Sequence, residues 1–142
     1  MKTRGEQMVY GIDNQITTLQ SATYSTNQQL IQKRDDLERL KTTFKQVENY
    51  QEEFQINQRY CFEPELTVHT WNGQQASQFQ DFRHQDLQES YQSIVQRQFE
   101  HIISQLADKM EEIRVSIGDL QREYVAKNTR LSDLRAANRG AE

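Results

Sequence analysis

Residues 61–73 read "CFEPELTVHTWNG", and they are the one stretch in which an otherwise helical pattern fails. Pro64 has no amide hydrogen to donate, so a helix that reaches it either ends at or before Glu63 or gives way to a short separate turn through "PELTV". The stretch therefore predicts that the chain reverses direction over about residues 63–72.

Upstream of the reversal, apolar and small polar residues recur in alternating steps of four and three. This spacing averages 3.5 residues, the period of a helix that packs along a left-handed coiled-coil seam. It predicts one long helix over about residues 8–62. The seam positions are Ile12, Ile16, Leu19, Thr23, Thr26, Leu30, Lys33, Leu37, Leu40, Phe44, Val47, Gln51 and Phe54.

Downstream of the reversal, nearly the same spacing predicts a second long helix over about residues 73–138, followed by a frayed tail "AANRGAE". We expect the residues at this spacing to pack the second helix against the first or to face a partner. On the first helix, we expect the same of Leu30, Leu37, Leu40, Phe44 and Val47. The positions are Val95, Phe99, Ile102, Leu106, Met110, Ile113, Ile117, Leu120, Tyr124, Lys127, Leu131 and Leu134, preceded by Phe79, Leu87 and Tyr91.

Two long helices joined by one reversal predict the fold class: all-α, an elongated antiparallel two-helix hairpin with a Trp-x-Gly bend. The 142 residues suit a single helical-hairpin domain over 1–142. At about 1.5 Å per residue, each helix would run on the order of 80–90 Å, so we expect a rod.

The composition agrees with a thin helical core and excludes several classes. The chain has one proline, five glycines and 35% hydrophobic residues, and its mean hydropathy is −0.97. No apolar run is long enough for a membrane span, and the start lacks the apolar segment of a classical signal peptide. The net charge of −4 lies in mixed-sign runs, which disfavours nucleic acid as a partner. Cys61 has no second cysteine to pair with, which indicates a buried or half-buried thiol in a reducing compartment.

The residues around the only tryptophan predict how the second helix begins. Asn72 and Gln75 have the spacing of a capping box, and Trp71 would precede the cap and pack over Ala76. Gly73 leaves the first turn without a side chain. Trp71 can therefore serve to close the hairpin, to offer an aromatic surface to a partner, or to do both.

Catalytic chemistry finds little support. His69, His84 and His101 lack a spacing that would bring two of them to one metal ion, and a Cys61–His69 pair without an oxyanion-binding loop is usually incidental. Adjacent carboxylates, as in Glu111 and Glu112, point to different sides of a helix. We therefore expect no enzyme activity, no catalytic residue, no metal site and no cofactor.

The "WNG" motif at the bend between two long amphipathic helices resembles the WXG superfamily of type VII (Esx) secretion hairpins. The fuller pattern, "PEL" followed closely by Trp-x-Gly and then Phe79, is most similar to the YwqH-like family of Gram-positive bacteria, whose members accompany LXG polymorphic toxins. The resemblance covers the architecture of nearly the whole chain.

That resemblance implies a non-enzymatic targeting factor. Its partners would be the helical N-terminal domain of an LXG-type toxin, a second small helical targeting protein and, transiently, the membrane secretion ATPase, without stable membrane insertion. The protein would reside in the bacterial cytoplasm before export, and secretion together with its toxin is one option.

The resemblance also implies an export motif that includes Trp71 and Gly73, but the usual C-terminal aromatic-x-x-x-acid pair is absent, because Asn128 follows Tyr124 at that spacing. Phe82 and Asp86 have the required spacing and are a candidate export pair. The simpler interpretation is that Phe82 covers the hairpin and Asp86 is solvated or complements the helix dipole. A partner could supply a missing signal.

Polar residues interrupt both seams, at Thr23, Thr26, Lys33, Gln51 and Lys127, which lowers stability but fixes register and partner choice. Other apolar residues lie off the seams, and some of them are expected to face a third helix: Tyr24, Ile31, Tyr50, Ile94, Ile103, Val115 and Val125. The alternative is a self-sufficient hairpin with scattered surface apolar groups. The corresponding alternative function is a generic coiled-coil scaffold or homodimeric structural protein with no export role.

Overall fold

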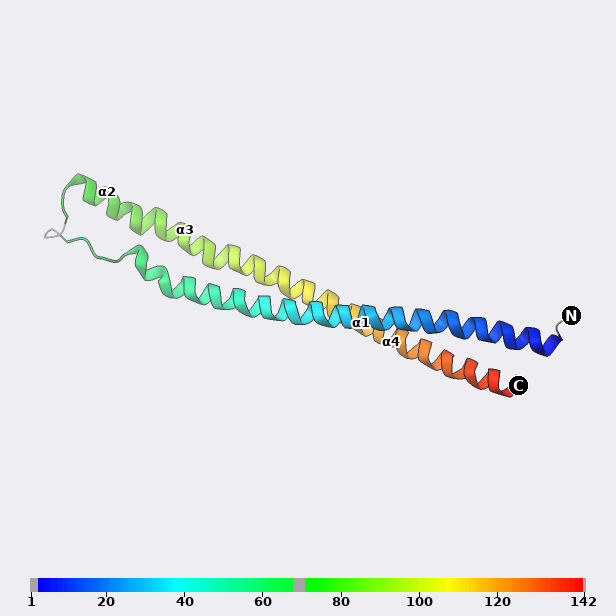
Figure 1. The fold of residues 1–142 in the computed structure, drawn as a ribbon. Coiled ribbons are helices and arrows are strands. Elements are labelled where there is room, and N and C mark those ends of the chain that lie inside the picture. Colours follow the sequence, from blue (N-terminus) through cyan, green and yellow to red (C-terminus); the bar gives the residue numbers. More distant parts are fainter. Residues whose placement is uncertain (1–2, 68–70, 142) are drawn as a thin grey trace. The chain divides into compact units, whose positions relative to one another are not determined.

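The computed structural model describes residues 3–67 and 71–141, and over these residues the chain is an all-α helical hairpin without a strand (Figure 1). The first arm is α1 (Arg4–Asn57), extended by the 3-10 turn η1 (Gln58–Cys61). The all-α helical hairpin predicted from the two seams is thereby confirmed.

The second arm is one unbroken run of helix in which two turns are wider than the rest. It consists of α2 (Gln74–Phe82), the π-helical turn η2 (Arg83–Leu87), α3 (Gln88–Ser93), the π-helical turn η3 (Ile94–Gln98) and α4 (Phe99–Ala141). In η3 the amide of Phe99 donates to the carbonyl of Ile94, five residues earlier, where an α-helix would use the fourth.

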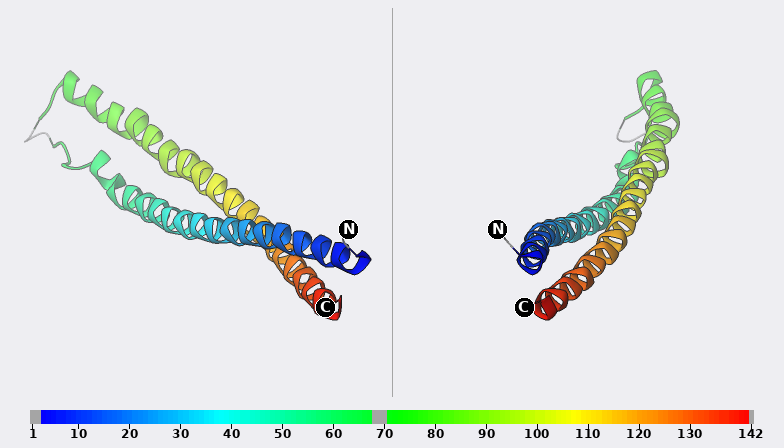
Figure 2. Two further views of the ribbon diagram at one scale, coloured as in Figure 1. Left: turned by 45° about the vertical axis from the view of Figure 1, so that its right-hand side comes forward. Right: turned by 90° about the vertical axis from the view of Figure 1, so that its right-hand side faces the viewer.

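The described residues group into two compact units, each of which contains a stretch of both arms. Unit 1 comprises the described parts of Met1–Arg39 and Glu111–Glu142, and unit 2 comprises those of Leu40–Met110. Figure 2 follows the two arms in further views.

In unit 1 the buried apolar residues are Leu30, Ile113, Leu120, Leu131 and Leu134. The polar seam residue Thr26 lies among them, only 2% exposed, and its Oγ1 donates to the carbonyl of Ala22 and accepts from Lys127 Nζ at 2.7 Å. Near the chain ends, Asn138 Nδ2 donates to Asp13 Oδ1 at 2.9 Å. Asp13, early in α1, thus bonds to Asn138, late in α4, and the later Thr26 bonds to the earlier Lys127. This is the order expected of antiparallel helices.

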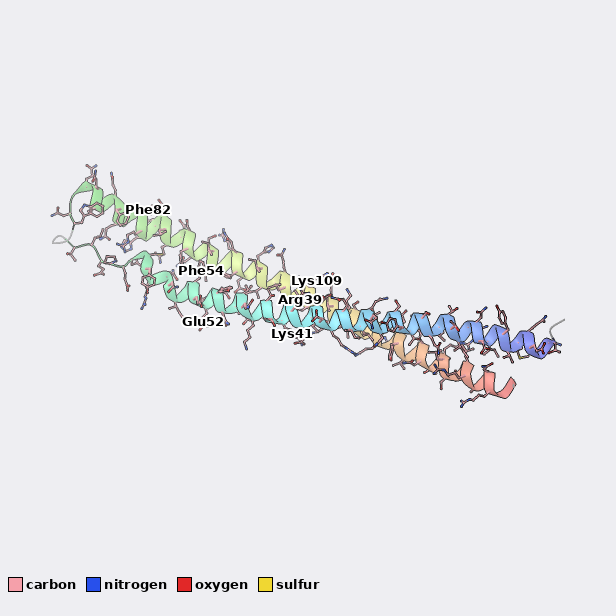
Figure 3. The ribbon with its side chains drawn as sticks, in the orientation of Figure 1. Arg39, Lys41, Glu52, Phe54, Phe82 and Lys109 are labelled. Atoms are coloured by element: carbon pink, nitrogen blue, oxygen red, sulfur yellow. The ribbon has the colours of Figure 1, made fainter. Side chains whose placement is uncertain are left out.

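In unit 2 the arms meet through aromatic rings and one amide. The ring of Phe54, which is labelled in Figure 3, contacts two rings of the second arm. Its centroid lies 5.5 Å from that of Tyr91 and 5.1 Å from that of Phe99. One turn earlier in α1, Gln51 Nε2 donates to the carbonyl of Val95 in η3 at 3.1 Å and to Glu100 Oε1 at 2.9 Å. Gln51, a polar residue in the seam, therefore forms hydrogen bonds between the arms.

The predicted seam residues are buried or half-buried except Phe54, Phe79 and Ile102, and Ile102 is a correction. Ile102 is 44% exposed, and its neighbour Ile103 is half-buried in its place. The reason is that the inward residues from Arg83 to Ile103 recur every four residues. Each π turn takes up one extra residue, so these 20 residues make about five full turns of helix and return to the same face.

The helix boundaries differ from the predicted ones by a few residues. The α-helical part of the first arm begins at Arg4 and ends at Asn57, and η1 fills the remainder of the predicted range. The predicted frayed tail is instead helical to Ala141, with Asn138 held by its bond to Asp13. Between the arms, residues 62–73 are not helical where the structure describes them, and the Glu63–Pro64 peptide bond is cis.

Candidate functional site

Arg83 organises the connection between the arms in unit 2. Its side chain is only 5% exposed; Nε donates to the carbonyl of Cys61 at 2.7 Å, and Nη1 donates to the carbonyl of Pro64 at 2.9 Å. The guanidinium carbon also lies 5.5 Å from the centre of the Phe79 ring. Because the last carbonyls of a helix lack amide partners and carry partial negative charge, a cation at Cys61 stabilises the end of η1.

Two further contacts hold the connecting segment to the second arm. Gln80 Nε2 donates to the carbonyl of Leu66 at 3.0 Å, and the ring of His84 stacks on that of Phe62 with centroids 5.0 Å apart. His84 also shares a hydrogen bond with Gln80. The path of residues 61–66 is therefore fixed mainly by side chains of α2 and η2.

Trp71 is attached to the start of α2 and still offers much of its surface to solvent. Its ring centroid lies 5.6 Å from that of Phe79, and Trp71 is 43% exposed. The ring partner is thus Phe79, which is itself 42% exposed. Ala76, the predicted partner, is buried, and it lines the same surface hollow as Trp71.

The predicted cap at Asn72 is wrong by one residue. The position before the first helical residue, Gln74, is Gly73, whose φ of 101° lies in the left-handed region that favours glycine. Asn72 therefore lies one residue before the cap position, which Gly73 occupies. Trp71, Asn72 and Gly73 are the last three residues before α2.

Phe82 and Asp86 are the candidate export pair, and both are exposed. Phe82, labelled in Figure 3, is the last residue of α2, and Asp86 lies within η2. Phe82 is 46% exposed. Trp71, Phe79 and Phe82 are thus three aromatic side chains at and near the start of the second arm that are each more than 40% exposed. The assignment of Trp71, Gly73, Phe82 and Asp86 to export stays a prediction.

The histidines, the cysteine and the carboxylates that were weighed as catalytic or metal-binding residues do not form a cluster among the described residues. The thiol of Cys61 is buried and free, whereas His69 lies outside the described residues. Over residues 3–67 and 71–141, no three side chains of His, Cys, Asp and Glu come together as a metal site would require. Burial, and secondarily the Cys61 thiol, raises the pKa of Tyr91 above its ordinary value.

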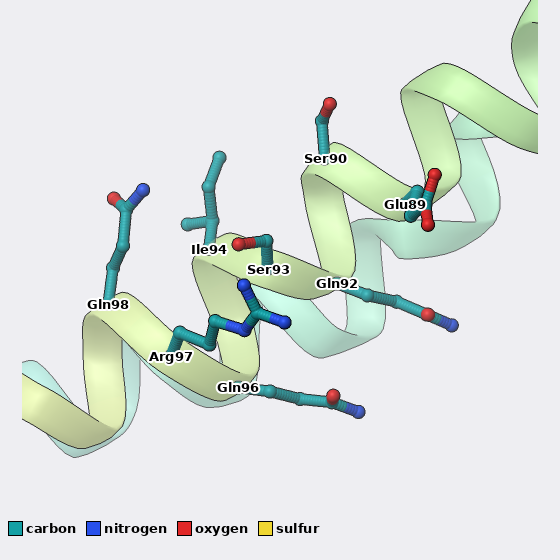
Figure 4. Close-up of a pocket in the computed structure, with 8 residues that line it drawn as sticks. All are labelled: Glu89, Ser90, Gln92, Ser93, Ile94, Gln96, Arg97 and Gln98. Atoms are coloured by element: carbon teal, nitrogen blue, oxygen red, sulfur yellow. The ribbon is translucent and has the colours of Figure 1, made fainter.

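A second surface hollow lies over α3 and η3 and is lined by the second arm alone (Figure 4). The lining residues are 89, 90, 92–94 and 96–98. Its side chains are mostly serine and glutamine, with Ile94, Glu89 and Arg97. A third hollow, in unit 1, lies between the arms and is lined by Ala22 and Leu19 of α1 and by Arg130 and Leu134 of α4, among others.

The off-seam apolar residues divide into two groups. Ile94 and Ile103 are half-buried within the hairpin. The others are more than half exposed: Tyr24 (67%), Ile31 (52%), Tyr50 (54%), Val115 (56%) and Val125 (63%). These five residues are part of the apolar surface that the hairpin itself leaves open, which also includes Tyr10, Ile56 and Tyr60.

Sequence reasoning missed Arg83 as the residue that holds the connection. A signal was present, because Arg83 lies four residues after Phe79 and four before Leu87, which is a seam position. An arginine at such a place indicates carbonyl groups to be satisfied.

No helix in the described part of the chain is both long and apolar enough to cross a membrane. No curated protein and no solved structure matches the chain. The model of one protein family, described as YwqH-like, matches residues 14–136, which include both arms and their connection. The chain therefore belongs to the YwqH-like family.

Proposed function

We propose that this protein is a non-enzymatic adapter that binds the helical N-terminal domain of an LXG-type toxin and helps to present it to the type VII secretion system. The observation that carries the proposal is the family match over residues 14–136 on a chain that folds as a helical hairpin. A second small helical targeting protein would complete the complex.

The polar seam residues bond within the hairpin, whereas exposed apolar residues on its outer surface are left uncovered. This difference supports a binding role for the outer surface. The seam residues Thr26 and Lys127 bond to each other, and Gln51 bonds across the arms. The hairpin thus sets its own register. What it leaves for a partner is the exposed apolar set, including Tyr24 and Val125.

The aromatic end of unit 2 is the proposed export element. Trp71 and Phe82 are each nearly half exposed beside Gly73 and Asp86, and exposed aromatic surface of this kind commonly serves recognition. In this proposal the membrane ATPase contacts these residues transiently, and the toxin supplies any signal that the C-terminal part of this chain lacks. The adapter then resides in the bacterial cytoplasm until export and can leave with its toxin.

The binding step is tested with the purified chain and the N-terminal helical domain of an LXG-type toxin from the same organism. We expect a complex, and at a toxin-domain concentration of one hundred times Kd the hairpin should gain about 2.7 kcal/mol of stability. Equal melting temperatures with and without the toxin domain, combined with a stable homodimer of the free chain, would favour a structural scaffold and overturn the adapter.

The export step is tested in producing cells. Without this chain, the toxin should accumulate inside and disappear from the medium, and expression of the chain from a plasmid should restore export. A control substrate of the same secretion system that uses other adapters should be unaffected. Unaltered toxin export in the absence of this chain would contradict the proposal.

A further inference from the structure

One segment of α1 differs from the rest of the chain in its charge. Residues 14–32, "NQITTLQSATYSTNQQLIQ", contain no Asp, Glu, Lys or Arg, whereas eleven of the next 21 residues, 33–53, are charged. The uncharged segment lies wholly in unit 1. A solvated helix does not need such a segment, because its outer faces are free to carry charge.

The exposed residues of this segment form a second stripe beside the seam. Thr17, Tyr24 and Ile31 are seven residues apart, and each directly follows a seam residue, so they lie on one side of α1 about 100° from those residues. Tyr10 extends the stripe by one more heptad and is 61% exposed.

Residues of α4 at the equivalent heptad positions lie on the same side of unit 1 as this stripe. Gly118 and Val125 directly follow the seam residues Ile117 and Tyr124, and equivalent heptad positions flank the seam on the same side in an antiparallel pair. The uncharged flank is defined by these residues: Thr17, Gln20, Tyr24, Asn27 and Ile31 of α1, and Gly118, Gln121, Val125, Asn128 and Ser132 of α4.

Over residues 118–133 the two sides of α4 differ in charge. The other side of α4 carries Asp119, Glu123, Arg130 and Asp133. On the uncharged flank, by contrast, Tyr24, Ile31 and Val125 are each more than half exposed. Interface centres are typically depleted of charge and enriched in tyrosine.

Covering the flank would leave few polar groups unsatisfied. The Thr17 hydroxyl donates to the carbonyl of Asp13 at 3.0 Å, so its outward surface is chiefly a methyl group. The amides of Gln20 and Asn27 are uncharged and can bond to another amide or hydroxyl. A carboxylate or ammonium group placed against residues 17–31 of α1 would lose water and find no opposite charge among these residues.

We propose that the uncharged flank is where unit 1 receives a helix of the toxin's N-terminal domain, a helix whose contact stripe is itself uncharged and repeats every seven residues. This inference rests on the proposed function and assigns its binding step to a surface. The heptad spacing of Thr17, Tyr24 and Ile31 matches the contact stripe of a packed helix, and the absence of charge over 14–32 favours an occupant without charge along about 28 Å.

The chain offers matched controls for the test. Tyr24 and Tyr50 both lie on α1 at 67% and 54% exposure, and Ile31 and Ile56 lie on it at 52% and 59%. Tyr24→Lys and Ile31→Lys add one charge each to the uncharged flank. Tyr50→Lys and Ile56→Lys add the same charge to exposed positions of α1 in unit 2. Because all four side chains are exposed, each variant should keep the melting temperature of the unaltered chain.

Affinity for the purified toxin N-terminal domain is then measured by titration calorimetry. We expect Tyr24→Lys and Ile31→Lys each to weaken binding at least tenfold, Tyr50→Lys and Ile56→Lys to stay within twofold, and the conservative Ile31→Val to stay within threefold. If a lysine variant on the flank fails to fold, Val125→Lys provides the same comparison from α4.

The possible outcomes distinguish a wrong binding surface from a wrong proposed function. Binding by the unaltered chain with equal losses for both pairs of variants would overturn the inference alone. No binding by the unaltered chain would overturn the proposed function and this inference with it. A free chain that sediments as a dimer and becomes monomeric on Tyr24→Lys would show that a second copy, and not a toxin helix, occupies the flank.

Discussion

Lys127 and Thr26 are joined across the arms of unit 1 by a hydrogen bond of 2.7 Å at a place where a coiled-coil seam would normally hold two apolar side chains. Lys127 is also bound to Glu123, at 2.8 Å, so its charge is compensated on its own helix. The pair fixes the relative register of α1 and α4 in unit 1, at a cost in packing.

We expect Thr26→Val alone to lower the free energy of unfolding by about 1 kcal/mol, because Lys127 keeps its charge but loses an acceptor inside the seam. Replacing both partners, Thr26→Val with Lys127→Leu, should restore or exceed the original stability. A double-mutant cycle by urea unfolding measures the coupling, and additive effects of the two substitutions would show that the bond does not contribute.

Arg83→Ala should destabilise the chain by on the order of 3 kcal/mol, because hydrogen bonds from a charged donor to two carbonyls are lost. Arg83→Lys should recover only part of this, since an ammonium group lacks the guanidinium fork that reaches both Cys61 and Pro64. Thermal unfolding followed by circular dichroism gives the comparison, with the exposed Arg97 changed to Ala as the control. A melting temperature equal to that of the Arg97→Ala chain would contradict the role assigned to Arg83.

Ile113 and Val115 lie two residues apart on α4 and test the orientation of the seam. Ile113 is 5% exposed and Val115 is 56% exposed. Ile113→Asp should cost more than about 3 kcal/mol because an unpaired carboxylate enters the seam, whereas Val115→Asp should change stability by less than about 1 kcal/mol. Similar melting temperatures for the two variants would mean that this part of the seam is assigned to the wrong face.

Trp71→Ala should cost about 1 kcal/mol, the usual strength of an aromatic pair, because the indole is only partly covered and its ring partner is Phe79. We expect the variant to fold and bind the toxin domain but to reduce toxin export. Tyr60→Ala, which removes another exposed aromatic residue of unit 2, is the control. Normal export by the Trp71→Ala chain would leave this residue with a structural role alone.

The hairpin could be predicted from the sequence because its seams repeat over many heptads, so that single exceptions such as Thr26 do not hide the period. The reversal was equally accessible, since Pro64 excludes a continuous helix. The family could be recognised from "PEL", "WNG" and Phe79. The roles of Trp71 and Phe82 in export were expectations from that resemblance, and they stay so.

Other features depend on geometry that a periodic pattern does not contain. The cap moved from Asn72 to Gly73 because of one backbone angle. Ile102 turned outward because two π turns changed the phase of the second arm, and the step of four that runs through Tyr91, Val95 and Phe99 was the only sign of them. The two units and the expected overall length are not decided by the seam spacing, and the rod stays a prediction.

The π turns also bear on how this chain tolerates changes of length. The Phe99 amide in η3 already reaches the Ile94 carbonyl, so removal of Gln96 between them would turn that same bond into an ordinary α-helical one. Every residue from Phe99 onward would keep its present face. A one-residue deletion within α4, such as that of Ser104, would instead rotate everything downstream by about 100° and expose the seam. Natural variants whose second arm is one residue shorter between its ends should therefore have lost that residue at η2 or η3. The two turns are the places where the length of this arm can change without a change of fold.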